Sequence, residues 1–201
     1  MQKNIKRFKG LTIGLEEIAS DDFNRANDSA GIGANWLELR STINHTITSN
    51  TAGISATGFA RTRWAGAGNW SPNQYSKLIV GSNGSNVSYG VGVRCTGGVN
   101  ALNTYDFVVG FGSWNIYRTV AEANTTLASS PATLSYNLLV GDLFELQIIG
   151  SILTAFINRV KVAQVVDTVL TTGVPMFENY NPLSGEQIGT NSWSGGNILL
   201  S

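Results

Sequence analysis

The sequence is poor in charged residues. Only 13% of its 201 residues are charged, about half of the roughly 25% found in an ordinary globular domain. The 13 basic residues balance the 13 acidic ones, and the lack of a basic excess argues against a general nucleic-acid binder. A hydrophobic fraction of 42% without net charge excludes a disordered chain. Too few helix-forming charged residues are present for a coiled coil or helical bundle.

Cysteine pairs and long apolar runs are also missing. The single cysteine, Cys95, excludes an internal disulfide, and we expect it to be a small buried residue rather than a reactive thiol. No apolar run reaches the roughly 18 residues of a membrane-spanning helix, so we expect no membrane partner. Residues 1–10 lack the apolar core and cleavage site of a classical signal peptide.

Basic residues are concentrated at the start of the chain. Residues 1–10 carry four basic residues and no acid, which leaves nine basic and 13 acidic residues in the remainder. We interpret residues 1–19 as a basic N-terminal arm and residues 20–201 as one domain. Such an arm is expected to attach to the body of its own chain or to another protein. Its candidate assembly residues are Lys3, Lys6, Arg7, Phe8 and Lys9.

Short β-patterned segments fill most of the chain. Alternating apolar and polar residues, rich in β-branched and aromatic types, predict strands, and Gly, Asn, Ser and Pro separate them, as in Asn179–Ser192. Helical turns are expected only near Leu11–Ile18 and Ala121–Leu127. Tight turns are expected at Gly112-Ser113, Gly150-Ser151 and Asn158-Arg159. About a dozen short strands predict an all-β antiparallel sandwich or jelly roll. The predicted strands are Asp22–Asn24, Trp36–Leu39, Ile43–Thr48, Ser55–Trp64, Tyr75–Val80, Tyr89–Cys95, Tyr105–Phe111, Trp114–Val120, Leu143–Ile149, Ile152–Asn158, Val160–Val166 and Asn197–Leu200.

Several segments are typical of one fold family. In the strongest, Gly141–Ser151 and Ala155–Arg159 form a strand, a Gly-Ser turn and a second strand that ends at an Asn turn. With Asp21–Asn27, Tyr105–Val109 and Asn191–Gly196, this pattern resembles the concanavalin A-like, laminin-G-like jelly roll over residues 20–201. The resemblance implies an antiparallel sandwich whose last strand pairs near the first. It implies little about function, because such folds include lectins, glycosidases, lyases and structural modules of phage virions and bacterial surface proteins.

The sequence contains no recognisable catalytic set. Retaining glycosidases need two carboxyl groups about 5–5.5 Å apart, which in one strand requires acids at alternate positions. The family's Glu-x-Asp-x-x-Glu motif is absent, and the members of Glu16-Glu17 and of Asp21-Asp22 would point to opposite faces. His45, the only histidine, is expected to be an ordinary strand residue. No nucleophile elbow or zinc-ligand spacing occurs, so we predict no enzymatic activity.

Two surfaces are candidates for sugar binding. Alternation predicts a polar face on one sheet, where aromatic rings would pack on sugar rings and Arg or Gln would bond to hydroxyls. The alternative is a solvated face with long side chains. The loop from Trp64 to Tyr75 is either an exposed aromatic patch or a cover over the edge of the core. Together the candidate glycan-binding residues are Arg63, Trp70, Tyr75, Lys77, Arg94, Trp114, Arg118, Glu145 and Gln147.

No cofactor is expected, and calcium is the one metal considered because it is common in the fold family. Hard cations require several oxygen ligands. Asp21 and Asp22 near the chain start could combine with Asn191 near its end. No clustered acidic motif supports such a site, and the alternative role of these residues is to stabilise turns.

Two functions remain open. The first is a non-catalytic structural protein: a virion decoration or fibre-type jelly-roll module held on a larger assembly, docked through the basic arm to other structural proteins or to another copy. The alternative is a soluble carbohydrate-binding, lectin-like module of a bacterial surface protein. Both place the chain on a virion or extracellular surface, with glycans as candidate ligands and no nucleic-acid partner.

Overall fold

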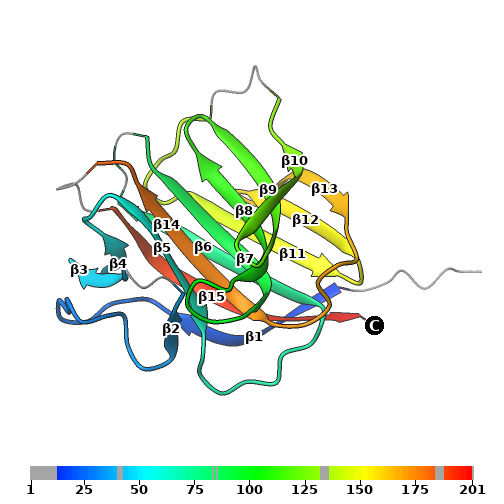
Figure 1. Ribbon diagram of the computed structural model, residues 1–201, viewed down its shortest axis with the longest axis horizontal. Helices are drawn as coiled ribbons and strands as arrows, with labels where there is room; N and C mark the ends of the chain where they lie inside the picture. Colours follow the sequence, from blue (N-terminus) through cyan, green and yellow to red (C-terminus); the bar gives the residue numbers. More distant parts are fainter. Residues whose placement is uncertain are drawn as a thin grey trace, which may run out of the picture.

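Two antiparallel β-sheets pack face to face in this protein (Figure 1). The computed structural model describes residues 13–39, 43–82, 84, 86–131, 136–183 and 188–200. These residues form strands, turns and loops but no helix, and accordingly none of them belongs to a helix that could cross a membrane. The predicted all-β antiparallel sandwich is therefore confirmed.

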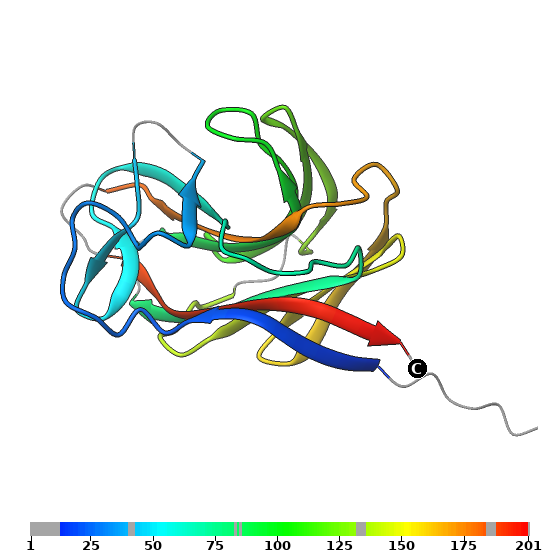
Figure 2. The ribbon, with the colours of Figure 1, turned by 90° about the horizontal axis from the view of Figure 1, so that it is seen from below.

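The first layer, called sheet A, contains the first and the last strand of the chain. β1 pairs with β15 over most of its length, so the two ends of the described chain lie side by side (Figure 2). The order of the other strands is β13-β12-β11-β6-β15-β4-β3. The strands of sheet A are β1 (Ile13–Asp21), β3 (Thr46–Thr48), β4 (Thr51–Ile54), β6 (Gln74–Ser82), β11 (Leu143–Ile149), β12 (Ile152–Ile157), β13 (Val160–Val166) and β15 (Ile188–Leu200).

The second layer, called sheet B, has the order β10-β9-β8-β7-β14-β5-β2. Chain segments rise on both sides of its outer face (Figure 2). This face becomes important below because it carries the candidate site. The strands of sheet B are β2 (Trp36–Glu38), β5 (Gly58–Trp64), β7 (Ser88–Thr96), β8 (Asn103–Gly110), β9 (Ser113–Val120), β10 (Ala123–Ser129) and β14 (Val174–Asn181).

The core lies between the sheets, and alternation along the strands fills it. In β11, for example, Phe144, Leu146 and Ile148 are fully buried while the residues between them face outward, as period-two geometry requires. At one end the ring of Trp36 meets Trp193 with centroids 4.7 Å apart and Phe177 with centroids 5.0 Å apart. Edge-to-face contacts of this kind stabilise the packing beyond the area they bury.

Both helical turns expected from the sequence are wrong. Residues 13–18 belong to β1, whose backbone groups are satisfied by pairing with β15, whereas a lone helical turn is costly to nucleate. The expected boundary of the arm at residue 19 therefore falls inside a strand. Near Ala121–Leu127, Ala121 and Glu122 have φ of 47° and 67° and form the hairpin turn before β10.

The predicted loop Asn179–Ser192 is also wrong over most of its length. β14, which was not predicted, extends to Asn181, and β15 begins at Ile188. Polar side chains are buried here: Asn179 Nδ2 donates to Thr190 Oγ1 at 3.3 Å, and Asn179 Oδ1 lies 2.9 Å from His45 Nε2. His45 is fully buried just before β3. Polar residues that satisfy one another inside a sandwich look like loop residues in a sequence.

Other local predictions fare better. The turns Gly150-Ser151 and Asn158-Arg159 are confirmed, and Asn158 and Arg159 have φ of 50° and 67°. The Gly112-Ser113 turn is shifted by one residue, which puts Phe111 at a φ of 54° on the turn between β8 and β9. Asp22–Asn24 lies in the loop after β1 rather than in a strand. Cys95 is buried as predicted, and burial raises the pKa of its thiol.

Candidate functional site

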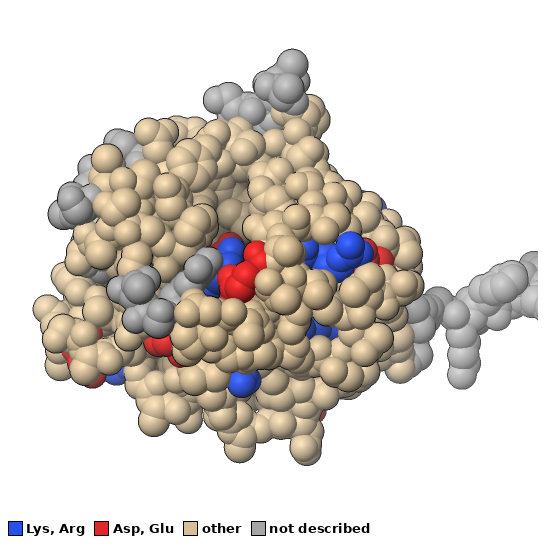
Figure 3. Space-filling model, viewed as in Figure 1, with Lys and Arg blue, Asp and Glu red and all other residues tan. Residues whose placement is uncertain are grey.

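A hollow lies on the outer face of sheet B, and basic and acidic side chains gather in and beside it (Figure 3). We call it the trough. Its volume is about 170 Å³. β5, β7, β8, β9, β10 and β14 all contribute to its lining, with the turn between β8 and β9 at one end. The lining residues used below are Phe59, Arg61, Asp106, Phe111, Asn124 and Glu178.

The floor of the trough depends on two glycines of β7. Gly90 and Gly92 have no side chains, so carboxyl groups from the neighbouring strands lean over them. A Cβ atom at position 90 would lie 2.6 Å from Glu178 Cγ, and one at position 92 would lie 2.7 Å from Asp106 Oδ1. Two acids from β14 and β8, far apart in sequence, are thereby brought to the same part of one sheet face.

Arg61 neutralises one of these acids. Its Nε donates to Glu178 Oε2 at 2.5 Å, and both residues are buried, with 6% and 3% of their surface exposed. Its NH1 lies 3.4 Å from Glu122 Oε2, while Glu122 Oε1 accepts from the backbone N–H of Leu102 at 3.0 Å. The charge of Glu178 raises the pKa of the Arg61 guanidinium further above its usual value. The cluster ties the floor to the loop between β7 and β8.

Asp106 is the second acid, and it is almost completely enclosed. Only 1% of its surface is exposed. Oδ1 lies 3.0 Å from Thr104 Oγ1, and Oδ2 lies 3.0 Å from Thr119 Oγ1. Burial first, and the charge of Glu178 second, raise the pKa of Asp106 to about 7, against the opposing effect of Arg61. This carboxyl group therefore changes its charge near neutral pH.

Exposed aromatic rings border the same trough. The ring centroid of Tyr180 lies 4.4 Å from that of Phe59 and 5.6 Å from that of Phe111. Phe59 is 38% exposed and Phe111 is 56% exposed, and through Tyr180 the two rings form one aromatic patch at the surface. The Arg61 guanidinium lies 5.3 Å from the centre of the Phe59 ring. Apolar ring surface and polar groups thus occur together.

The candidate residues expected to share one polar face are divided between the two sheets. Tyr75, Lys77, Glu145 and Gln147 lie in β6 and β11 of sheet A. The other strand residues of the set lie in sheet B, on β5, β7 and β9. The expectation of a single face is therefore wrong, because alternation within each strand says nothing about which strands become neighbours.

On β9, Trp114 and Arg118 were expected on the outer polar face, and the structure places them on the inner face instead. Trp114 is 6% exposed and Ile116 is fully buried, and both belong to the core between the sheets. Tyr117 consequently faces the trough. Arg118 is on the inner side, where its NH1 pairs with Asp167 Oδ2 at 2.6 Å. Arg63 does lie on the outer side of sheet B, and its Nε donates to the carbonyl of Gly97 at 3.2 Å.

Arg94 holds loops together. It sits at an irregularity of β7 with a φ of 53°, and only 4% of its surface is exposed. Its guanidinium donates to the carbonyl oxygens of Pro72, Leu170 and Gly150. Burial lowers the pKa of this guanidinium. All of these contacts are within the chain, so Arg94 acts as a structural anchor.

The aromatic loop before β6 covers the core. Trp64 and Tyr75 at its two ends are 8% and 1% exposed, and Trp70 is half-buried against the core. Of the two alternatives open for this loop, the burial of its aromatic residues is therefore confirmed.

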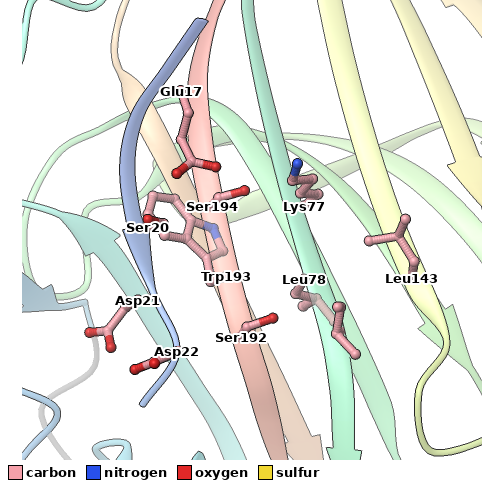
Figure 4. A pocket seen from close by; sticks show the side chains of 11 residues that line it. Glu17, Ser20, Asp21, Asp22, Lys77, Leu78, Leu143, Ser192, Trp193 and Ser194 are labelled. Atoms are coloured by element: carbon pink, nitrogen blue, oxygen red, sulfur yellow. The ribbon is translucent and has the colours of Figure 1, made fainter. Parts of the chain in front are cut away.

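The sheet A candidates surround a second, more open groove. Two adjoining hollows of about 480 Å³ each share Lys77, and the wall near β1 includes Glu17 and Ser194 (Figure 4). Lys77 lies opposite Glu145 across the strands, and Gln147 Nε2 donates to Glu145 Oε1 at 2.7 Å. Glu145 and Gln147 are thus bonded to each other on an open face, as expected for a solvated sheet surface.

The calcium candidates do not fit a metal site. Both oxygens of Asp21 accept hydrogen bonds from the Arg25 guanidinium at 2.8 and 2.9 Å, and Oδ2 also accepts from Trp36 Nε1 at 2.9 Å. Asp22 Oδ1 accepts from the backbone N–H of Asn24, and Asn191 lies at an irregularity of β15. Within the described ranges no three His, Cys, Asp or Glu residues gather as metal ligands would.

Sequence reasoning missed most of the trough. Asp106 and Glu178 are 72 positions apart in the chain, and they meet only because β7 lies between β8 and β14. The alternation Gly90-x-Gly92 was the available signal, since two glycines on one face of a central strand leave room for neighbouring side chains. The predicted assembly residues Lys3, Lys6, Arg7, Phe8 and Lys9 lie outside the described residues.

The fold of this chain is similar to the folds of several solved structures. The metal-free carbohydrate recognition domain of Emp46p matches with a TM-score of 0.62 and 10% identity, over 88% of this chain and 94% of that one. The carbohydrate-binding module CBM66 from Bacillus subtilis matches with a TM-score of 0.57 and 11% identity, over 84% and 96%. The Crh5 transglycosylase matches with a TM-score of 0.56 and 10% identity, over 90% and 85%.

These likenesses confirm the predicted concanavalin A-like jelly roll. At such low identity they show the fold alone. No family model matches the sequence. No curated protein matches it either.

Proposed function

We propose that this protein is a non-catalytic, lectin-like module that binds a carbohydrate in the trough of sheet B. The observation that carries the proposal is the exposed ring pair Phe59 and Phe111, in contact with Tyr180 and beside the Arg61–Glu178 ion pair. Sugars have apolar ring faces and polar rims, so they favour sites where aromatic surface and hydrogen-bonding groups adjoin.

The charges of the trough favour a neutral sugar. The only cationic side chain lining it, within the part of the chain that the structure describes, is Arg61, and Glu178 and Glu122 already engage that guanidinium. An acidic sugar would bring a further negative charge close to Glu178 and Asp106, which is unfavourable in a poorly solvated site. Carboxylate and amide oxygens instead accept hydrogen bonds from sugar hydroxyls.

Asp106 and Glu178 on one sheet face also suggest glycoside hydrolysis as a function. One of the solved structures with a similar fold is a transglycosylase. The contacts favour binding instead. Asp106 is 1% exposed and both its oxygens contact threonine hydroxyls, so it is badly placed to protonate a leaving group. Glu178 Oε2 already accepts a hydrogen bond from Arg61 Nε at 2.5 Å, so this oxygen is engaged within the chain and is badly placed to attack a sugar or to accept a proton from water.

An assembly role through the basic arm has less support. It depends on residues 1–12, which lie outside the described residues. Attachment to a virion or display at an extracellular surface therefore stays a prediction, and glycan binding is the function that described contacts support.

A glycan array that contains neutral and acidic oligosaccharides tests the proposal, followed by calorimetry with the best ligand. We expect a neutral glycan to bind and Phe111→Ala to weaken binding at least about 10-fold, as for loss of a stacking ring. Phe156→Ala is the matched control, because Phe156 lines the groove of sheet A on the other face. Its affinity should equal that of the unmodified protein.

Three outcomes contradict the proposal. The absence of any glycan bound at millimolar concentration would rule out the carbohydrate site. A loss of affinity in Phe156→Ala but not in Phe111→Ala would move the site to sheet A. Release of reducing sugar from the bound oligosaccharide, abolished by Glu178→Gln, would make the protein an enzyme.

A further inference from the structure

A line of hydrogen-bonded side chains connects the enclosed acid with the trough. Asp106 Oδ2 lies 3.0 Å from Thr119 Oγ1, and Thr119 Oγ1 lies 2.8 Å from Asn124 Oδ1. Asp106 and Thr119 are at most 1% exposed, whereas Asn124 is exposed and lines the trough. The threonine hydroxyl is thus the only group between a buried carboxyl and a surface amide.

When Asp106 is ionised, this line of side chains has fewer hydrogens to donate than acceptors to receive them. A threonine hydroxyl has one hydrogen to donate, but Thr119 then faces two acceptors, the Asp106 carboxylate and Asn124 Oδ1. A proton on Asp106 removes the conflict: Asp106 donates to Thr119, and Thr119 donates to Asn124 Oδ1. Without that proton, Thr119 donates to Asp106, and the amide of Asn124 must turn so that Nδ2 donates to Thr119.

We propose that the proton on Asp106 sets the orientation of the Asn124 amide and thereby the hydrogen-bonding group that the trough presents to its ligand. This inference rests on the proposed carbohydrate site. With Asp106 protonated, Asn124 directs its NH2 group away from Thr119 and offers the ligand donors. With Asp106 ionised, it offers the carbonyl oxygen instead. Asp106 and Thr119 are positioning residues that act through Asn124, because they are at most 1% exposed whereas Asn124 is exposed.

The surroundings allow both states near neutral pH. Two charged residues of neighbouring strands face Asp106, namely Glu178 on β14 and Arg61 on β5. Tyr117 and Thr119 on β9 and Thr104 on its own strand add hydroxyl groups. The thiol of Cys95 on β7 and the carboxyl group of Glu122 at the β9–β10 turn complete the titratable groups around it. Burial and Glu178 favour the neutral acid, while Arg61 and the threonine hydroxyls favour the ion. Their balance is what raises the pKa of Asp106 to about 7.

Loss of the donor should weaken sugar binding as the pH rises. The Asn124 NH2 group and the Tyr117 hydroxyl line this end of the trough as donors outside the Arg61–Glu178 ion pair, so turning the Asn124 amide removes one of these donors. Removing one hydrogen bond changes affinity by about 3- to 10-fold. We therefore expect affinity to fall by that factor between pH 5.5 and pH 8.5.

Nuclear magnetic resonance tests the relay without a ligand. The carboxyl carbon of Asp106 and the side-chain NH2 signals of Asn124 should titrate with one midpoint. Thr119→Val removes the hydroxyl, so Asn124 should no longer follow Asp106, while the matched Thr119→Ser variant should keep the coupling. In Asp106→Asn, the side-chain NH2 signals of Asn124 should no longer change with pH. This variant provides the test if Thr119→Val does not fold. Asn124 signals that are constant with pH, or that still titrate in Asp106→Asn, would overturn the inference.

Calorimetry across the same pH range tests its consequence. The unmodified protein should lose affinity for its neutral glycan as the pH rises, whereas the affinity of Asp106→Asn should stay constant. Equal pH dependence in both proteins would overturn the inference and leave the carbohydrate site intact. If no glycan binds, the proposed function fails, and the resonance titration still decides whether the relay exists.

Discussion

Arg61 Nε lies 2.5 Å from Glu178 Oε2, and this buried ion pair joins β5 to β14 beneath the trough. Forming such a pair requires the removal of two charges from water, so its net contribution to stability is small. Losing one partner has a far larger effect, because the other charge then stays buried without compensation. The pair consequently fixes the floor of the site as a unit.

The first prediction concerns this ion pair. Arg61→Met should lower the free energy of unfolding by about 3 kcal/mol, since Glu178 would be left buried without its partner. Arg63→Met is the matched control on the same strand, where hydrogen bonds to the carbonyls of Gly97 at 3.2 Å and Trp64 at 3.5 Å are lost, and should cost about 1 kcal/mol. Urea unfolding of the three proteins measures both values. Similar losses in the two variants would contradict the argument.

The second prediction follows from the raised pKa of Asp106. The pKa of Asp106 is about 7 in the folded chain, whereas the pKa of an aspartate in an unfolded chain is near 4. The folded state holds the proton more tightly, so this group's contribution to stability is present below about pH 4 and is lost as the pH rises through 7. Asp106→Asn cannot lose a proton in this way.

Stability curves of the two proteins should therefore diverge with pH. The free energy of unfolding of Asp106→Asn, relative to the unmodified protein, should rise between pH 4.5 and pH 8 by about 3 kcal/mol. All other titrating groups are common to both proteins, so the difference isolates Asp106. Urea unfolding at several pH values provides the measurement, and parallel curves would show that Asp106 titrates normally.

The fold was more predictable from the sequence than the site, and β7 shows why. Alternation placed Tyr89, Val91 and Val93 toward the core and the glycines between them outward, and the structure agrees. Burial of apolar area is a local demand that each strand satisfies in its own sequence. Most strands were found for this reason, while β1, β4, β10, β14 and the beginning of β15 were not.

Strand order, in contrast, comes from the packing of the whole chain. Lys77 and Glu145 are neighbours, as expected, since β6 pairs with β11. Arg63 and Trp114 were expected beside them but lie in the other sheet. The Asp106–Glu178 pair has no sequence motif, because each acid contributes one residue to a site that only the order β8-β7-β14 creates.

The third prediction separates structural from ligand-binding arginines. Arg94→Ala should lower the free energy of unfolding by about 3 kcal/mol, because carbonyl groups of three loops lose a charged donor. Glycan affinity should be unchanged, since Arg94 does not line the trough. Arg159→Ala, at an exposed hairpin turn, is the control for charge removal. Weaker glycan binding by folded Arg94→Ala would place Arg94 in the site instead.

The last prediction concerns the first strand, which crosses the expected boundary between arm and domain. β1 pairs with residues 193–200 of β15, and Asn197 Nδ2 donates to Glu16 Oε2 at 3.1 Å. A chain that starts at residue 20 loses this strand and exposes the edge of β15. We expect it to be at least about 3 kcal/mol less stable than a chain that starts at residue 13, and to self-associate through the open edge.

A point variant tests the same contact without a truncation. A Cβ atom at Gly196 would lie 1.9 Å from the carbonyl oxygen of Glu16, so Gly196→Ala should push β1 away from β15. Gly14→Ala is the matched control, because its Cβ would meet only the Leu199 side chain at 3.8 Å. Hydrogen exchange should accelerate along β1 in Gly196→Ala and stay slow in Gly14→Ala. Unchanged exchange in Gly196→Ala, together with full stability of the chain that starts at residue 20, would show that β1 belongs to the arm and not to the domain.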